Sequence, residues 1–469
     1  MTTAGQDFLR HARAVLVQLN ILTHGLRERG FRGSKDDAAI SDANQWRDAV
    51  YKKIGLRLVP ILFVTFALAM FDRTAISYAK LQFLSQLSFS ESIYGFGAGL
   101  FFIGYTLCEV PSNIYLQRKG VRLTLLRITM LWGAVTALTL LIRTPGQFYL
   151  ARLALGMAEA GFMPGVLLYF TYWFPGDKIG RINALLLMAN PISGMMGGLV
   201  AANIMTHSAG KFGLAGWQVL FLYLGILTML LGIFCYLYLA NSPNDVNWLD
   251  DREKALLRKE ASQRNSGARN AGTYAFFRDF RVYLTGLGYF TVNSSLTTLS
   301  LWGPSILKEL GVSQLEHIGM LNALPCGIGV IAMFMMSRSS DYFLERRWHF
   351  VGCSLLAAVG FAGLDIFHAH FNLAIAMLCV AAFGTFGGLP LYLTIPGDFL
   401  PRSSAAGGIA LVTATGGFGA FLTPWILGLI KSSSGSLYRG LIYSAVLCLL
   451  GACLVGLVMR GPRFKAPSI

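Results

Sequence analysis

Twelve long apolar runs constrain the fold of this 469-residue chain more than any other feature. A helix needs about 20 apolar residues to cross the hydrocarbon core of a bilayer, and each run is long enough. Only 13% of the residues are charged and 54% are hydrophobic, which is too apolar for an ordinary soluble domain. The sequence therefore predicts an all-α membrane protein with twelve transmembrane helices. The runs lie near 57–80, 91–117, 121–142, 146–173, 179–206, 217–240, 281–307, 316–337, 349–368, 371–396, 404–430 and 437–460.

The basic residues predict the orientation of these spans. If the N-terminus is cytoplasmic, the inner segments carry 31 Lys and Arg residues and the outer segments carry six, among them Lys80 and Lys431. Cytoplasmic loops of membrane proteins are enriched in Lys and Arg. We therefore expect a multi-pass protein of the cell (inner) membrane with both termini in the cytoplasm. The net charge of +16 then needs no nucleic-acid partner.

The two halves of the chain resemble each other at an offset of roughly 224 residues. Leu87–Gly95 falls opposite Leu310–Gly319, and Trp173–Gly198 falls opposite Asp398–Thr423. The competing explanation is that all membrane helices look alike, but the matches keep one register. We interpret them as two pseudo-symmetric six-helix bundles with a substrate site between them, near the midplane. The predicted domains are an N-terminal cytoplasmic arm (1–50), an N-terminal bundle (51–240), a cytoplasmic central loop (241–280), a C-terminal bundle (281–460) and a cytoplasmic tail (461–469).

Five ionisable residues lie inside the predicted spans, all in the N-terminal half: Asp72, Arg73, Glu109, Arg152 and Glu159. Burying such a group costs at least about 2.5 kcal/mol, so these residues are candidates for function. Arginine can bind a carboxylate through two hydrogen bonds, and buried carboxyl groups can exchange protons near neutral pH. We expect Asp72 and Glu159 to couple protons, and Arg73 and Arg152 to bind an anion. A static salt-bridge network is the alternative.

The spacing of these residues limits which of them can pair. Arg152 and Glu159 share one helix face but lie about 10.5 Å apart along it, too far for a direct ion pair. Each therefore needs a partner on another helix or in a water-filled cavity. Asp72 and Arg73 are adjacent and point about 100° apart. We expect one of them to face the cavity and the other a neighbouring helix.

Neutral polar residues are expected to complete the substrate site. These are Asn190 in the N-terminal half and Asn293, Thr297 and Thr413 in the C-terminal half. Residues near the cytoplasmic ends of the spans are expected to brace a gate: Glu109, Asn113, Arg118, Asp341, Arg346 and Arg347. The sequence contains no nucleotide-binding, hydrolase or metalloprotease motif. We therefore expect neither an enzyme nor a bound metal or cofactor.

Three motifs resemble the major facilitator superfamily, and within it the anion:cation symporter family, in particular bacterial tartrate/phthalate-type carboxylate permeases. They are Phe71–Thr74, Phe101–Asn113 and Arg152–Gly165, and the resemblance extends over about residues 50–460. It implies proton coupling at the positions of Asp72 and Glu159. It also implies anion binding and organisation of the charge network at those of Arg73 and Arg152. A monomer is the oligomeric state that the resemblance implies.

The expected function is proton-coupled symport of a small organic acid anion into the cell by alternating access. Sodium in place of the proton, anion exchange, and metabolite or drug export on the same fold remain alternatives. The chain departs from the family at Met70, Ala75, Thr297 and 412–417, where hydrogen-bonding residues are often found. Polyhydroxy acids need many such groups, so we expect a less hydroxylated acid, aromatic or aliphatic.

Overall fold

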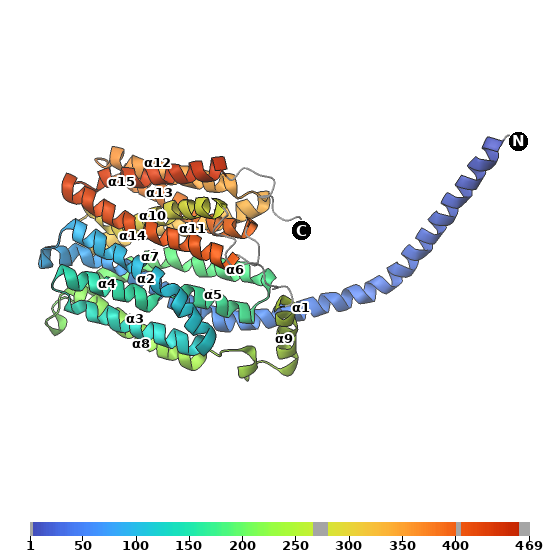
Figure 1. Ribbon diagram of the computed structural model, residues 1–469, viewed down its shortest axis with the longest axis horizontal. Helices are drawn as coiled ribbons and strands as arrows, with labels where there is room; N and C mark the ends of the chain where they lie inside the picture. The colour runs from blue at the N-terminus through green and yellow to red at the C-terminus, as the bar shows by residue number, and fades with distance from the viewer. Residues whose placement is uncertain (1–2, 266–279, 400–404, 459–469) are drawn as a thin grey trace. The chain divides into compact units, whose positions relative to one another are not determined.

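The computed structural model describes residues 3–265, 280–399 and 405–458, and these are almost entirely helical (Figure 1). The chain divides into two units, residues 1–58 and residues 59–469. The long helix α1 (Thr3–Leu87) crosses this division, and only its part from Val59 onward belongs to the larger unit. The larger unit holds the rest of the described helices and is described below by itself.

The first half of the larger unit contains the end of α1 and seven further helices. They are α2 (Glu91–Lys119), α3 (Val121–Leu138), α4 (Pro145–Glu159), α5 (Phe162–Trp173), α6 (Gly176–Leu187), α7 (Ala189–His207) and α8 (Gly216–Tyr238). Short 3-10 turns lie at Thr139–Leu141, Lys211–Gly213 and Pro243–Asp245, and α9 (Asp251–Asn265) follows in the central loop.

The second half contains six long helices. They are α10 (Phe280–Glu309), α11 (Leu315–Phe343), α12 (Arg347–Phe367), α13 (Phe371–Phe399), α14 (Ala405–Ser434) and α15 (Leu437–Cys453), which continues as a π-helical segment, Leu454–Val458. From residue 91 onward the predicted spans agree with the helix bounds to within several residues in the described part of the chain. The first predicted span, 57–80, lies inside the much longer α1.

Eleven of the described helical segments are long and apolar enough to cross a membrane. The remaining predicted span, 281–307, corresponds to α10. This helix has 30 residues and packs against α13, α14 and α15, so it spans about 45 Å within the bundle. Its lower apolarity comes from hydroxyl side chains such as Ser294 and Thr298, which donate hydrogen bonds to carbonyl oxygens one turn earlier. The twelve-span architecture therefore holds.

Two predicted spans each consist of two helices. Span 146–173 breaks between α4 and α5, where Gly161 has φ +85°. Span 179–206 breaks at Met188, between α6 and α7. At each break, one carbonyl group has no helical N–H partner because the residue four positions later is a proline. These pairs are Ala160 with Pro164 and Leu187 with Pro191. A proline ring displaces the carbonyl of the fourth preceding residue and offers no N–H to it, which explains both breaks.

Helix packing defines the two bundles. In the first, α3 packs against α4 and α8, and α2 against α4; in the second, α12 packs against α13 and α15, and α11 against α13. The helices α2 to α8 and α10 to α15 lie on opposite sides of the view in Figure 1. Between the bundles, α2 packs against α14 and α7 against α11.

Glycines allow these inter-bundle contacts. A Cβ atom at Gly95 or Gly99 of α2 would overlap the carbonyl oxygen of Pro424 or Phe421 on α14, respectively. On the other pair, a Cβ at Gly319 would lie 2.7 Å from the carbonyl oxygen of Gly198. These positions lie toward the end of the bundles where α1 ends and α2 begins, called the outer end below. Here the backbones approach as closely as small residues permit.

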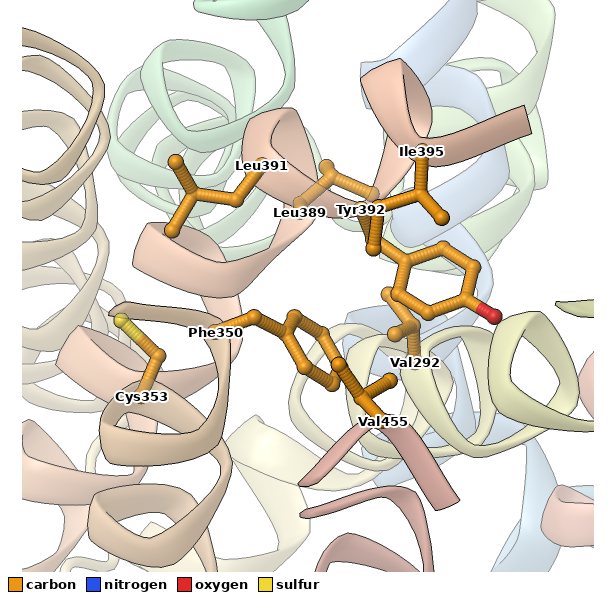
Figure 2. Packing of buried hydrophobic residues seen from close by; sticks show 8 residues of the cluster. All are labelled: Val292, Phe350, Cys353, Leu389, Leu391, Tyr392, Ile395 and Val455. Carbon is orange, nitrogen blue, oxygen red and sulfur yellow. The ribbon is translucent and has the colours of Figure 1, made fainter. Parts of the chain in front are cut away.

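An apolar cluster holds the C-terminal bundle together internally. Figure 2 shows the side chains of Phe350, Tyr392 and Val455 grouped together in this cluster. The rings of Phe350 and Tyr392 are 5.0 Å apart, and the Tyr392 hydroxyl donates a 2.5 Å hydrogen bond to the carbonyl oxygen of Thr285. This cluster thereby joins α10, α12, α13 and the π-helical segment.

Replacing Gly161 by Ala tests the break between α4 and α5. The new Cβ would overlap the Ser112 hydroxyl, and φ +85° is strained for any L-residue with a side chain. We expect a loss of about 1–3 kcal/mol in stability, seen as a lower melting temperature in detergent. Gly146→Ala is the control, because nothing lies within 4 Å of its Cβ position in the first turn of α4. Equal melting temperatures for the two variants would contradict this account.

Candidate functional site

Asp72 is buried inside the N-terminal bundle and is bound to α3. Its side chain is 1% exposed. Oδ2 accepts hydrogen bonds from the indole N–H of Trp132 at 2.6 Å and from the hydroxyl of Thr136 at 2.8 Å. These donors lie one turn apart on α3, so they reach one carboxylate oxygen from the same face. Asp72 therefore faces the neighbouring helix α3.

Arg73 forms an ion pair with Glu159. Its Nε donates a 2.9 Å hydrogen bond to Oε2 of Glu159, and the two side chains are 22% and 1% exposed. The guanidinium group also lies over two rings of α2, 5.0 Å from the centre of Phe101 and 4.9 Å from that of Tyr105. The partner that Glu159 needed on another helix is thus Arg73.

Arg152 lies against the same phenylalanine ring. Its guanidinium carbon is 5.1 Å from the centre of Phe101, and the residue is 3% exposed. Phe101 therefore attracts both guanidinium groups through its ring. The sequence predicts that Arg152 and Glu159 are too far apart to pair. In the structure Glu159 pairs with Arg73, which is consistent with that prediction.

Each of the four charged residues keeps one buried polar atom without a hydrogen-bond partner among the described residues. These atoms are Asp72 Oδ1, Arg73 Nη2, Arg152 Nε and Glu159 Oε1. Buried polar groups in proteins are nearly always hydrogen-bonded. Two donors and two acceptors without protein partners therefore leave room for a ligand, water or a proton at this cluster.

A partly open cavity lies between the bundles, with about 490 Å³ of space not occupied by protein atoms, open solvent included. From the N-terminal bundle it is lined by Thr74, Tyr78, Asn190 and Gly194. Asn322 of α11 also lines it and donates a 2.8 Å hydrogen bond from Nδ2 to the Tyr78 hydroxyl. The four charges are not among its lining residues, although Thr74 directly follows Arg73. The other lining residues, all from the C-terminal bundle, are Leu299, Ser300, Gly303, Pro325, Cys326, Leu378, Ala382 and Phe386.

The four neutral residues predicted to bind substrate are dispersed. Asn190 lines the cavity, and the other three are not among its lining residues. Thr297 is buried and donates its hydroxyl hydrogen to the carbonyl oxygen of Asn293, and Thr413 donates to the carbonyl oxygen of Ala410. Asn293 is half-buried, with its amide nitrogen beside Gly416. The hydroxyl donors of Thr297 and Thr413 are therefore used within their own helices.

The predicted gate residues of the N-terminal half lie on α2. Glu109 and Asn113 are half-buried, and Arg118 is exposed in the last turn. Asn113 lies next to the break between α4 and α5, since its Oδ1 would be 3.5 Å from a Cβ at Gly161. Asn113 thus lies beside the break that follows Glu159.

The gate residues of the C-terminal half lie around the α11–α12 turn. Asp341 is exposed in the last turn of α11, and Arg346 is half-buried at the N-cap position of α12. Arg347 donates a hydrogen bond to the carbonyl oxygen of Gly456. Glu345 lies in the turn between these helices. Burial raises its pKa, but hydrogen bonds from the backbone N–H of Trp348 and from His349 lower it by more. The pKa of Glu345 therefore lies below the usual range. Glu345 therefore caps α12 as a carboxylate.

The sequence alone misassigned Lys80 and Lys431 to the outer segments. Both lie inside helices at the outer end, and Lys80 is 2% exposed. A signal was present for Lys80, because it follows Arg73 by seven residues and so shares its helix face. Tyr78 and Tyr105 also went unrecognised as part of the site, since a tyrosine in an apolar span is usually packing.

A comparison with protein families identifies the architecture. The model of the Major Facilitator Superfamily matches residues 62–364. The chain belongs to this superfamily. A candidate tartrate transporter of Agrobacterium vitis is 36% identical over 428 residues, covering 91% of this chain and 94% of the relative. A quinolone resistance transporter of Acinetobacter baumannii is 35% identical over 415 residues, covering 87% and 94%.

Solved structures support the same fold. A bacterial homologue of the human lysosomal transporter Spinster, solved in an inward-facing and unoccupied conformation, superposes with a TM-score of 0.71. It is 17% identical and covers 87% of this chain and 98% of that one. Family and relatives are all transporters, so this superfamily member is a multi-pass membrane transporter of a small molecule and not an enzyme.

Thr136→Val tests whether α3 stabilises the buried Asp72 carboxylate. The substitution keeps the side-chain shape but removes one of two hydrogen bonds to Oδ2. We expect a loss of about 1–3 kcal/mol, typical of a hydrogen bond to a buried charged group, seen as a lower melting temperature in detergent. Thr139→Val is the matched control, because that hydroxyl donates only to the backbone carbonyl of Val135. If both variants melt alike, the hydroxyl of Thr136 contributes nothing to Asp72.

Proposed function

We propose that this transporter is a proton-coupled symporter that carries small organic acid anions into the cell. The observation that carries the proposal is the buried Arg73–Glu159 ion pair, which lies beside guanidinium donors that lack protein partners. Arginine keeps its charge and offers two parallel donors to a carboxylate. A cluster with two arginines in the N-terminal bundle is suited to an anion and unfavourable for a cation.

Competition for Arg73 couples the anion to the proton. In the structure, Glu159 occupies Nε of Arg73. Protonation of Glu159 would remove the negative charge that holds this guanidinium and would free it for the carboxylate of a substrate. Loss of this proton from Glu159 would restore the ion pair and displace the anion. Asp72, with one free carboxylate oxygen, is the second proton site of the proposal. The co-transported ion is proposed to be a proton, and sodium is the alternative.

The distribution of basic residues supports the proposed orientation of the protein in the membrane. With 31 Lys and Arg residues assigned to one side, we place both termini in the cytoplasm of a cell with an inner membrane. The outer end then faces away from the cytoplasm, and the inter-bundle contacts of α2 with α14 and of α7 with α11 close that side. A monomer suffices for this mechanism, because both bundles belong to one chain.

The cavity supports a substrate with few hydroxyl groups. Its C-terminal wall carries Leu299, Leu378 and Phe386, while Asn190 and Asn322 supply amides. A polyhydroxy acid would leave several of its hydroxyls without partners on this wall, which is costly. We propose an aromatic or aliphatic acid, with its carboxylate toward Arg73 and its apolar part in the cavity.

Export is the second candidate function. The relative from Acinetobacter baumannii is named for quinolone resistance and aligns along most of this chain. An apolar cavity wall also suits a lipophilic solute. Export would appear as efflux of such a solute, driven by protons moving inward. Anion exchange on the same arginines would need no net proton movement.

Glu159→Gln separates these functions. We would measure uptake into proteoliposomes under an imposed inward proton gradient, with a pH dye inside. We expect gradient-driven uptake to fall by at least about tenfold while anion exchange continues. Gln keeps the size of the side chain but cannot gain or lose a proton near neutral pH. Glu316→Gln is the control, since Glu316 is exposed at the outer end. Loss of uptake and exchange together would assign Glu159 to binding or folding instead.

A panel of acids tests the substrate class. With the wild-type protein, we expect benzoate- or phthalate-type acids to be taken up faster than gluconate-type sugar acids, by about tenfold or more for each hydroxyl left unpaired. The measurement is initial uptake of labelled acids at equal concentration and proton gradient. Faster uptake of gluconate would refute the proposed substrate class without affecting proton coupling.

A further inference from the structure

Four alternating charges form a row across the two bundles at the outer end. Lys80 of α1 binds Glu91 of α2 at 2.7 Å, and Glu91 binds Lys431 of α14 at 2.7 Å. Lys431 in turn binds Glu309 of α10 at 2.8 Å. This set is called the outer charge row below. Its middle contact, between Glu91 and Lys431, is the one ion pair of the row that joins the two bundles.

Lys80 extends beyond its own bundle into a pocket on α10. Its ammonium group donates a 2.9 Å hydrogen bond to the Ser305 hydroxyl and lies 3.7 Å from the centre of the Trp302 ring. Tyr94 of α2 completes the pocket, with its ring 4.4 Å from the ammonium group and its hydroxyl donating to the carbonyl oxygen of Leu301. The Lys80 side chain thus lies buried between the bundles, in contact with both.

The pairing within each bundle shows how the row could separate. Lys80 and Glu91 both belong to the N-terminal bundle, and Lys431 and Glu309 both belong to the C-terminal bundle. Moving the bundles apart would break the contact between Glu91 and Lys431 and remove Lys80 from Ser305 and Trp302. Each bundle would still keep one complete ion pair. Opening therefore leaves no charge without a partner, whereas a single bridging pair would leave two.

We propose that Lys80 is a positioning residue for alternating access. It holds Glu91 toward Lys431 and inserts its ammonium group into the α10 pocket, and so stabilises the conformation closed at the outer end. The lysine must leave this pocket each time that end opens. The inference rests on the proposed function only for the assignment of the outer end to the cell exterior.

Lys80→Met tests the proposal, because methionine keeps most of the side-chain length without the charge. Spin labels at His207→Cys and Glu316→Cys would report the separation of α7 and α11, since these exposed side chains face each other 3.5 Å apart. The labelled protein needs its seven native cysteines replaced. We expect the ratio of the open population to the closed population, read from the distance distribution, to rise about tenfold in Lys80→Met. A change of this size is expected for loss of a hydrogen bond to a charged group.

Two further variants keep the result interpretable. Ser305→Ala removes only the acceptor on α10 and leaves every charge of the outer charge row in place, so we expect a smaller shift in the same direction. Lys211→Met is the matched control, because Lys211 lies at the same end but is exposed and bonds only to Ser208 of its own bundle. Distance distributions of Lys80→Met and Ser305→Ala that equal that of Lys211→Met would overturn the proposal.

A transport readout distinguishes positioning from simple structural support. If Lys80→Met populates the outward-open state, the apparent KM for external substrate should fall, because more transporter is ready to bind from outside. The maximal rate should fall as well, since closure becomes slower. An unchanged KM with a reduced rate would contradict the proposal. The spin-label measurement needs neither substrate nor proton gradient, so it can fail or succeed independently of organic acid symport.

Discussion

A charge buried among membrane helices must have a partner, and the organisation of this transporter follows from that constraint. Arg73 and Glu159 satisfy each other inside the N-terminal bundle, and the outer charge row satisfies four more charges between the bundles. In the first set, Arg73 Nη2 and Glu159 Oε1 have no hydrogen-bond partner among the described residues, as a binding site requires. In the second set, the ion pairs follow one another across the two bundles, as a closed gate requires.

Backbone geometry places these charges. Glu159 is the last residue of α4, directly before the break that Gly161 and Pro164 create. At the break, Ser112 and Asn113 of α2 lie close to Gly161. Elsewhere on α2, Gly95 and Gly99 allow α14 to approach closely. One helix, α2, thus contacts the charge cluster, the outer charge row and the other bundle, so movement between the bundles is mechanically linked to the site.

The sequence was sufficient for most of the fold. Apolar length alone predicted the spans, because a helix must cross a hydrocarbon layer of nearly constant thickness. It also identified the four charges of the N-terminal bundle, since each is costly in a span. The predicted roles of Thr297 and Thr413 stay predictions, since their hydroxyls bond within their own helices in this structure. A hydroxyl in a span can bond to its own backbone or to a ligand, and composition does not distinguish the two.

What the sequence determined by itself is therefore the membrane-spanning architecture and the identity of the costly charges, both of which follow from local chemistry. Only the tertiary structure decided how the charges pair. It turned Asp72 toward Trp132, brought Glu159 to Arg73 and inserted Lys80 between the bundles rather than in an outer loop. Each of these contacts joins residues 60 or more positions apart in the chain. Such contacts depend on how whole helices pack, and no local pattern of residues encodes that.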